Sequence, residues 1–117
     1  MKPSNMLFIF SDQHTRNATG CYGHPQVKTP HLDKLAAGGT RFTNAYTNGP
    51  ICVPSRASMA TGRHVHDIGI WDNCRPYHGE TPSWGHLLME QGHRVTSIGK
   101  LHYRDTQDPN GFSEEIV

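Results

Sequence analysis

One pattern occurs twice in this chain, and it constrains the fold more than any other feature. A Thr-Pro pair opens a stretch of helical apolar spacing that ends at glycine, once in TPHLDKLAAGG and again in TPSWGHLLMEQGH. Threonine suits a helix N-cap, proline the first turn and glycine the C-terminal cap. We therefore expect helices over residues 29–38 and 81–92. Their apolar faces are expected at Leu32, Leu35 and Ala36, and at Trp84, Leu87 and Leu88.

Strand-like runs alternate with these two helices. NMLFIF near the N-terminus is a short unbroken apolar run, which is typical of a strand buried on both faces. TRFTNAYT and HRVTSIGK follow the two helices directly. The alternation predicts an α/β protein with a mostly parallel sheet flanked by helices. The last residues, GFSEEIV, add no further closing element, so we expect one domain over residues 1–117 that is incomplete at its C-terminus.

Polar residues stand at the ends of two of the expected strands. Asp12 follows the first apolar run, and Lys100 and His102 follow the run HRVTSI. Ligands of α/β proteins bind outside the carboxyl ends of parallel strands. A binding site is therefore expected at these three residues.

Composition excludes several classes of protein. Eleven basic and ten acidic side chains give a formal charge of +1, which lacks the basic excess of a nucleic-acid or membrane-surface protein. No apolar run approaches the ~18 residues of a membrane-spanning helix. The N-terminal apolar run is too short for a secretion signal and ends at Asp12. We therefore expect a cytoplasmic protein with no nucleic-acid or membrane partner.

Cysteine and histidine usage argues against structural zinc and disulfides. The three cysteines form no CxxC pair and are odd in number, which disfavours a disulfide framework or a zinc knuckle. The nine histidines are scattered, and the strand-like alternation of His64-Val65-His66 has no third ligand nearby. Structural or surface roles are expected for His14, His64, His66, Cys21 and Cys74.

The segment ICVPSRASMATGR places a cysteine where an anion is favoured. Pro54 suits the first turn of a helix, so Cys52 is expected at or just before the helix N-terminus, where free N–H groups and the dipole attract negative charge. Arg56 lies about one helical turn further on and can reach back over the same spot. On spacing alone, a buried cysteine with Arg56 facing solvent is an equal alternative.

The phrase CVPSRASMATGR resembles the signature of the sulfatase family, Cys-x-Pro-Ser-Arg followed by Thr-Gly-Arg. FIFSDQH, YGHPQVKTPHLDKLAAGGTRFTNAY and GKLHY resemble the family's first metal-binding strand, its next stretch and its Gly-Lys-x-His segment. The resemblance implies an alkaline-phosphatase-like α/β fold and makes this chain the N-terminal part of a sulfatase catalytic domain.

Within the family, the chain looks most similar to the branch of choline-sulfatases and phosphonate monoester hydrolases. Gln13 stands where many arylsulfatases carry a second aspartate after the first strand. Asn73, in IWDN, stands where that branch places an asparagine that contacts the substrate. The resemblance therefore implies a substrate-binding role for Asn73.

The resemblance also implies a chemistry for Cys52. In the family, a formylglycine-generating enzyme oxidises this cysteine to formylglycine (3-oxoalanine), and the Cys-x-Pro-x-Arg core directs the modification. Cys52, Pro54 and Arg56 match that core. One hydroxyl of the hydrated aldehyde attacks sulfur or phosphorus and displaces the alcohol. Loss of the other hydroxyl's proton expels the sulfate, an exit that an unmodified thiol lacks.

Three basic residues complete the implied catalytic set. Arg56 holds the developing negative charge. Lys100 contacts a sulfate or phosphate oxygen as a point charge. His102 donates a proton to the leaving group or binds the anion.

A divalent cation is the second implied cofactor. Asp12 supplies a carboxylate oxygen, Gln13 an amide oxygen and the modified Cys52 a hydroxyl, and calcium is the first choice with magnesium or manganese as alternatives. Family members run to several hundred residues, and their second pair of metal ligands lies beyond residue 117. The 117-residue chain alone is therefore expected to bind metal weakly and to show little or no activity.

The leading interpretation is a sulfuric ester hydrolase that acts on a small-molecule sulfate ester. This interpretation is compatible with a homo-oligomer. A phosphonate or phosphate ester hydrolase using the same site is the enzymatic alternative. A truncated, unmodified chain that binds anions without turnover is the non-enzymatic alternative. A cysteine-dependent phosphatase is disfavoured, because those enzymes separate cysteine and arginine by more than the three residues between Cys52 and Arg56.

Overall fold

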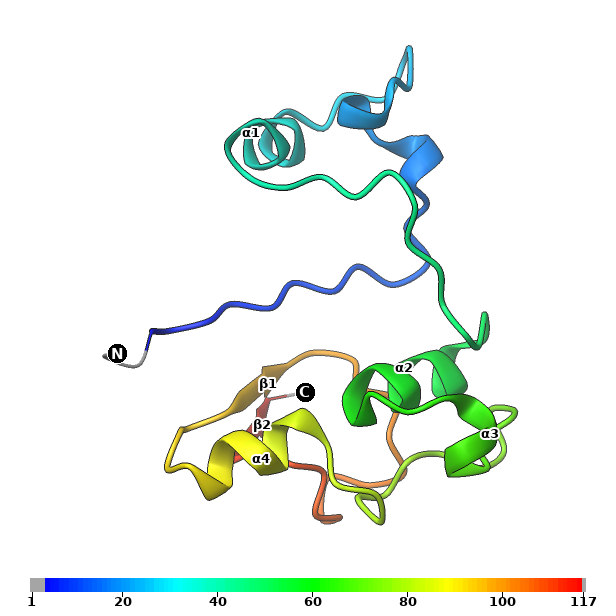
Figure 1. The fold of residues 1–117 in the computed structure, drawn as a ribbon, viewed down its shortest axis with the longest axis vertical. Coiled ribbons are helices and arrows are strands. Elements are labelled where there is room, and N and C mark those ends of the chain that lie inside the picture. Colours follow the sequence, from blue (N-terminus) through cyan, green and yellow to red (C-terminus); the bar gives the residue numbers. More distant parts are fainter. Residues whose placement is uncertain (1–3, 117) are drawn as a thin grey trace. The chain divides into compact units, whose positions relative to one another are not determined.

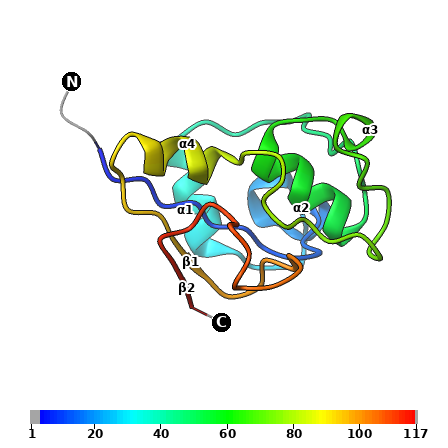
Figure 2. The same ribbon diagram turned by 90° about the horizontal axis from the view of Figure 1, so that it is seen from below.

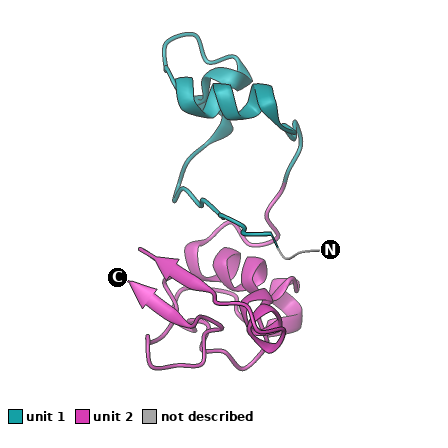
Figure 3. Cartoon of the chain, turned by 90° about the vertical axis from the view of Figure 1, so that its left-hand side faces the viewer, with its two compact units in different colours: residues 1–45 teal, residues 46–117 magenta. Residues whose placement is uncertain are grey.

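The computed structural model describes residues 4–116. The chain divides into two compact units, Met1–Ala45 (unit 1) and Tyr46–Val117 (unit 2) (Figure 3). Figure 1 shows their elements, which are η1 (Arg16–Ala18), η2 (Gly20–Tyr22), α1 (Pro30–Gly38), α2 (Cys52–Thr61), α3 (Val65–Ile68), α4 (Trp84–Glu90), β1 (Thr96–Ile98) and β2 (Glu114–Ile116). None of the helices in the described range is long and apolar enough to cross a lipid bilayer.

Unit 1 contains the two short 3₁₀ helices and α1, which begins at the predicted proline. Thr29 is the N-cap residue of α1, but its side chain does not make the predicted capping hydrogen bond. Its hydroxyl instead donates to Asp33 Oδ1 at 2.9 Å and accepts from the Gly20 N–H at 2.8 Å. The Cys21 N–H donates to the same Asp33 oxygen at 2.6 Å. These hydrogen bonds join α1 to η2, so the first Thr-Pro pattern fixes a helix and its contact with the preceding turn.

Two predicted strands, over residues 5–10 and 40–47, do not form in the described part of the chain. The first segment has exposed apolar side chains, with Met6, Leu7 and Ile9 exposed by 70%, 83% and 75%. A strand exists only beside a hydrogen-bonded neighbour, and these segments have none among residues 4–116. The strand predictions were therefore wrong for this chain.

The predicted apolar face of α1 has the expected spacing but is not covered. Leu32 and Leu35 are 45% and 69% exposed, and no residue of α1 is buried. Apolar periodicity indicates which residues gain from burial, whereas the burial itself needs a second surface.

Unit 2 has a hydrophobic core. Its buried members are Val53 and Ala57 of α2 together with Ile70 and Tyr77, and Tyr103 packs against them. α2 contacts both α3 and α4. The helix that carries Cys52 is therefore built into the hydrophobic core of unit 2.

α4 begins at Trp84, two residues later than the second Thr-Pro pair predicts. Its N-cap is Ser83, whose hydroxyl accepts from the His86 N–H, while His86 Nδ1 accepts from the Ser83 N–H at 3.0 Å. This reciprocal capping box satisfies two backbone donors, which Thr81 cannot do from its position. The helix itself is confirmed, and Gly92 follows its end with φ 83°.

The strand-like alternation of His64-Val65-His66 was misleading, because these residues form the start of α3. His64 is the N-cap residue, and its N–H donates to Asp67 Oδ2 at 3.3 Å. The rings of His64 and His66 stack with centroids 5.2 Å apart. The Asp67 carboxylate, three residues after His64, stabilises the first turn of α3. The alternation of histidine and valine gave no indication of this turn.

The described sheet consists of β1 and β2, which lie side by side (Figure 2). They pair in parallel, with Ser97 opposite Glu115 at the centre of the register. The run HRVTSIGK therefore contains the predicted strand, and the parallel direction is confirmed. β2 was not predicted, because GFSEEIV shows neither alternation nor an apolar run.

Candidate active site

Cys52 is the first residue of α2, as predicted. The preceding Ile51 is extended, at φ −128° and ψ 151°, and its side chain offers no acceptor to the helix. Pro54 has no N–H, and the first hydrogen bond of the helix runs from the Ser55 N–H to the Ile51 carbonyl at 3.0 Å. The Cys52 side chain is half-buried at the positive end of the helix dipole.

Asn73 reaches this helix end from the loop after α3. Its Oδ1 accepts from the Val53 N–H at 3.0 Å. The contact places Asn73 beside the residue that follows Cys52. The amide oxygen therefore has a backbone partner, a contact that the sequence did not indicate.

The Arg56 side chain lies inside unit 2 rather than in solvent. The residue is 4% exposed, and its Nη1 donates to the Lys100 carbonyl at 2.6 Å. A buried guanidinium is retained only where its N–H groups find acceptors. The alternative of a solvent-facing arginine is therefore wrong, and Arg56 ties the Cys52 helix to the loop that carries Lys100 and His102.

That loop, residues 99–103, is held at both ends. The Gly99 N–H donates to the Ile116 carbonyl at 2.7 Å, which anchors the loop to the sheet. At the other end, the Tyr103 ring meets the Tyr77 ring edge to face, with centroids 4.9 Å apart. Lys100 and His102 lie between these anchors, so their backbone position is set by the core.

The phenols of Tyr77, which is buried, and Tyr103, which is half-buried, lie within electrostatic range of one another, and Tyr103 also within that of Arg56. Burial raises the pKa of the Tyr103 phenol well above its ordinary value; the neighbouring Tyr77 raises it further, and the Arg56 charge opposes the shift. Burial also raises the pKa of Tyr77, against a hydrogen bond with Ser83. Both phenols are therefore neutral around physiological pH, and they add no negative charge beside Arg56.

Two of the predicted site residues have an unusual backbone conformation. Gln13 and His102, at φ 56° and φ 58°, are the non-glycine residues of positive φ within the described range. Side chains with a Cβ adopt this region rarely, and such residues concentrate at functional sites. The two outliers support a functional role for both positions, independently of the sequence motifs.

The predicted metal ligands Asp12 and Gln13 lie in unit 1, in an exposed turn that follows residues 5–10. Their oxygen atoms suit a hard cation such as calcium, which takes about 6–8 oxygen ligands. Among residues 4–116 there is no cluster of three or more His, Cys, Asp or Glu side chains that could hold a metal ion. The two side chains offer oxygen donors of the right type, but they are too few for a complete cation site.

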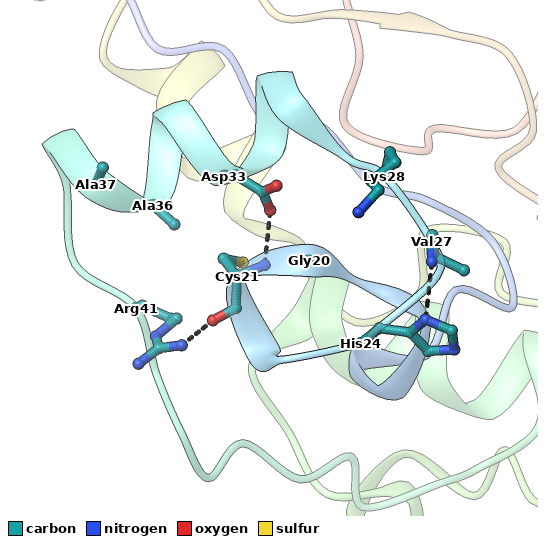
Figure 4. A pocket seen from close by; sticks show the side chains of 9 residues that line it. All are labelled: Gly20, Cys21, His24, Val27, Lys28, Asp33, Ala36, Ala37 and Arg41. Carbon is teal, nitrogen blue, oxygen red and sulfur yellow. Dashed lines mark hydrogen bonds between the residues drawn. The ribbon is translucent and has the colours of Figure 1, made fainter.

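A hollow of about 590 Å³ lies in unit 1 and contains none of the predicted site residues (Figure 4). Arg41 donates to the Cys21 carbonyl at its edge and lies 5.3 Å from the centroid of the Tyr22 ring. His24 Nδ1 accepts from the Val27 N–H at 2.9 Å. The backbone N–H and carbonyl of Cys21 thus both have hydrogen-bond partners within unit 1.

A cysteine at a helix N-terminus, tied by a buried arginine to a lysine- and histidine-bearing loop, forms a site suited to an anionic group. A sequence model described as Sulfatase matches residues 4–114. The chain therefore belongs to the sulfatase family.

Individual relatives agree with this assignment. The chain is 36% identical to the N-acetylglucosamine-6-O-sulfatase of Bacteroides thetaiotaomicron over 95% of its own length and 20% of the relative's. It is 36% identical to the uncharacterized sulfatase YidJ of Escherichia coli over 97% of its length and 23% of the relative's. Human arylsulfatase A is 52% identical over 60% of this chain and 14% of its own. The chain thus spans about a fifth of the length of the first two relatives.

A solved structure confirms the fold class. The structure of BT4656 in complex with its substrate D-glucosamine-2-N,6-O-disulfate matches 87% of this chain and 20% of its own, with a TM-score of 0.80 and 35% identity. The predicted α/β sulfatase fold is therefore confirmed for the part that this chain contributes. The narrower resemblance to choline-sulfatases and phosphonate monoester hydrolases stays a prediction.

Proposed function

We propose that the protein to which this chain belongs hydrolyses a small-molecule sulfate ester, with a formylglycine made from Cys52 as the nucleophile. The observation that carries the proposal is the hydrogen bond from Arg56 to the Lys100 carbonyl, because it joins the cysteine motif and the Gly-Lys-x-His loop in one site. Membership of the sulfatase family supports the reaction class.

The proposal assigns each residue of the site a task. Formylglycine, when present as its hydrate, supplies one hydroxyl as the nucleophile. Its second hydroxyl allows the sulfate to be released, and an unmodified thiol has no such group. The N-terminal end of α2 and the Arg56 guanidinium stabilise negative charge beside position 52. Lys100 binds a sulfate oxygen, and His102 protonates the departing alcohol or binds the anion.

A divalent cation, calcium first, is proposed as the second cofactor. Asp12 and Gln13 are its proposed ligands from this chain, together with the modified side chain at position 52. Since these donors are too few for a complete site, we expect the 117-residue chain alone to bind calcium weakly and to show little or no esterase activity. A formylglycine-generating enzyme is the proposed maturation partner.

The substrate class is supported by the names of the relatives. They act, by name, on an N-acetylglucosamine 6-O-sulfate and on aryl sulfates. A phosphonate or phosphate ester is the second candidate, favoured by Gln13 in place of a second aspartate.

The test uses the whole protein, co-expressed with a formylglycine-generating enzyme. Rates are measured on an aryl sulfate and on the matched aryl phosphonate, for the parent and for the variants Cys52→Ala and Lys100→Ala. Lys28→Ala, an exposed lysine of unit 1, is the matched control. We expect sulfate hydrolysis that is lost in Cys52→Ala, falls at least about tenfold in Lys100→Ala and is unchanged in Lys28→Ala. A preference for the phosphonate would favour the second candidate, and activity that persists in Cys52→Ala would contradict the proposal.

A further inference from the structure

We propose that Asn73 is a positioning residue that caps the Cys52 helix without adding negative charge to it. The inference rests on the proposed function, because it concerns how the helix end receives an anionic ester. It assigns the Asn73 amide oxygen to the protein backbone rather than to the substrate.

The first turn of α2 lacks its usual capping group. The N-cap residue is Ile51, an aliphatic residue, whereas Ser, Thr, Asp and Asn are the residues that cap helices through a side-chain oxygen. Pro54 removes one of the donors that otherwise need an acceptor. The donors left in the first turn are the N–H groups of Cys52 and Val53.

Asn73 supplies the missing acceptor from 20 residues further along the chain. Its Oδ1 lies 3.0 Å from the Val53 nitrogen. The Cys52 N–H has no acceptor among the described residues. One donor is thus fixed by Asn73, and the adjacent donor stays available to an anion at position 52.

The neutrality of this cap matters for an anionic substrate. Aspartate caps helices as well as asparagine does, but it places a full negative charge at the helix end. That charge would offset the positive end of the dipole and repel a sulfate ester. An amide cap keeps the helix in place and leaves the positive potential at Cys52 intact.

The test separates capping from charge by comparing Asn73→Ala with Asn73→Asp in the 117-residue chain. Thermal unfolding reports the cap. The second readout is the ratio of the alkylation rates of Cys52 by iodoacetate, an anion, and by iodoacetamide, a neutral reagent. This ratio reports the local potential, and mass spectrometry of the peptide over residues 42–56, which has no other cysteine, assigns it to Cys52.

Asn73→Ala is expected to lower the melting temperature by about 3–8 °C with little change in the ratio. Asn73→Asp is expected to keep the melting temperature within about 2 °C of the parent while lowering the ratio roughly threefold or more at low salt. Asn44→Asp, an exposed asparagine of unit 1, controls for net charge and should leave the ratio unchanged. The ratio at Cys21 serves as the internal reference.

Two results would overturn the inference. An unchanged melting temperature in Asn73→Ala would show that the amide oxygen does not stabilise α2. An unchanged ratio in Asn73→Asp would show that the charge of the cap does not reach Cys52. Because the thiol form is used, neither result depends on formylglycine or on turnover, so the proposed function stands or falls separately.

Discussion

Unit 1 and unit 2 differ in how far they bury the apolar residues that their sequences supply. Unit 2 closes a core around Tyr77, which is 2% exposed, whereas in unit 1 no residue of α1 is buried and Leu35 is 69% exposed. Both units have well-formed helices and local hydrogen bonds. The motif around Cys52 is therefore supported by packing within unit 2. The apolar face of α1 in unit 1 is not covered by the described part of its own unit.

The largest effect is expected from the core of unit 2. Tyr77→Ala removes a buried ring and the hydrogen bond from its hydroxyl to the Thr81 carbonyl, at 2.5 Å. The free energy of unfolding should fall by about 3–5 kcal/mol, which amounts to much of the stability of a small domain. Chemical denaturation followed by tryptophan fluorescence measures it, because both tryptophans lie in unit 2. A loss below about 1 kcal/mol would show that unit 2 does not depend on this core.

A smaller effect is expected from the link between α2 and the loop. Arg56→Lys keeps the positive charge but shortens the side chain and removes the planar fork, so the Lys100 carbonyl loses its donor. We expect a loss of about 1–3 kcal/mol of unfolding free energy, together with faster hydrogen exchange in residues 99–103. If exchange in the loop stays as in the parent, Arg56 does not position it.

Alkaline pH should weaken unit 2 specifically. The pKa values of Tyr77 and Tyr103 are raised by burial, so the folded state keeps protons that the unfolded state releases. Their contribution to stability is therefore complete below the ordinary tyrosine pKa of 10.0 and is lost as the pH rises above it, by up to about 1.4 kcal/mol per pH unit for each phenol. Denaturation curves across this range measure the slope. Tyr103→Phe should flatten it, and Tyr46→Phe, at a tyrosine that is 90% exposed, should not.

The smallest effect is expected on α1 of unit 1. Leu35→Ser replaces an exposed leucine, so the free energy of unfolding of the 117-residue chain should change by less than about 0.5 kcal/mol. A larger loss would mean that this face is covered in solution, and sedimentation of parent and variant would then show whether a second copy covers it. That outcome would erase the contrast between the two units.

Local signals in the sequence predicted the helices well. The Thr-Pro pairs located α1 and α4, and Pro54 placed Cys52 at the start of α2, because caps and prolines act within one helical turn. The shift of the α4 N-cap to Ser83 arose from its reciprocal pairing with His86, a competing local signal. The run HRVTSIGK correctly predicted β1. The strands predicted over residues 5–10 and 40–47 do not form, because these segments have no hydrogen-bonded neighbouring strand among residues 4–116.

The contacts that make the site were beyond prediction from one sequence. Arg56 and Lys100 are 44 residues apart, and Asn73 and Val53 are 20 apart, so no local pattern links them. The positive φ of Gln13 and His102 also lacks a sequence signal, because neither is a glycine. The motifs named the residues of the site, whereas their arrangement came only from the tertiary structure.

The measurement that tests the central claim most directly is the mass of the tryptic peptide over residues 42–56, from protein made in its native host and treated with iodoacetamide. Formylglycine at position 52 predicts a peptide that takes up no carbamidomethyl group and has the mass of the aldehyde or its hydrate. A peptide that is fully carbamidomethylated at Cys52 would contradict the account, because the thiol would then be the mature state and the site would bind anions without turning them over.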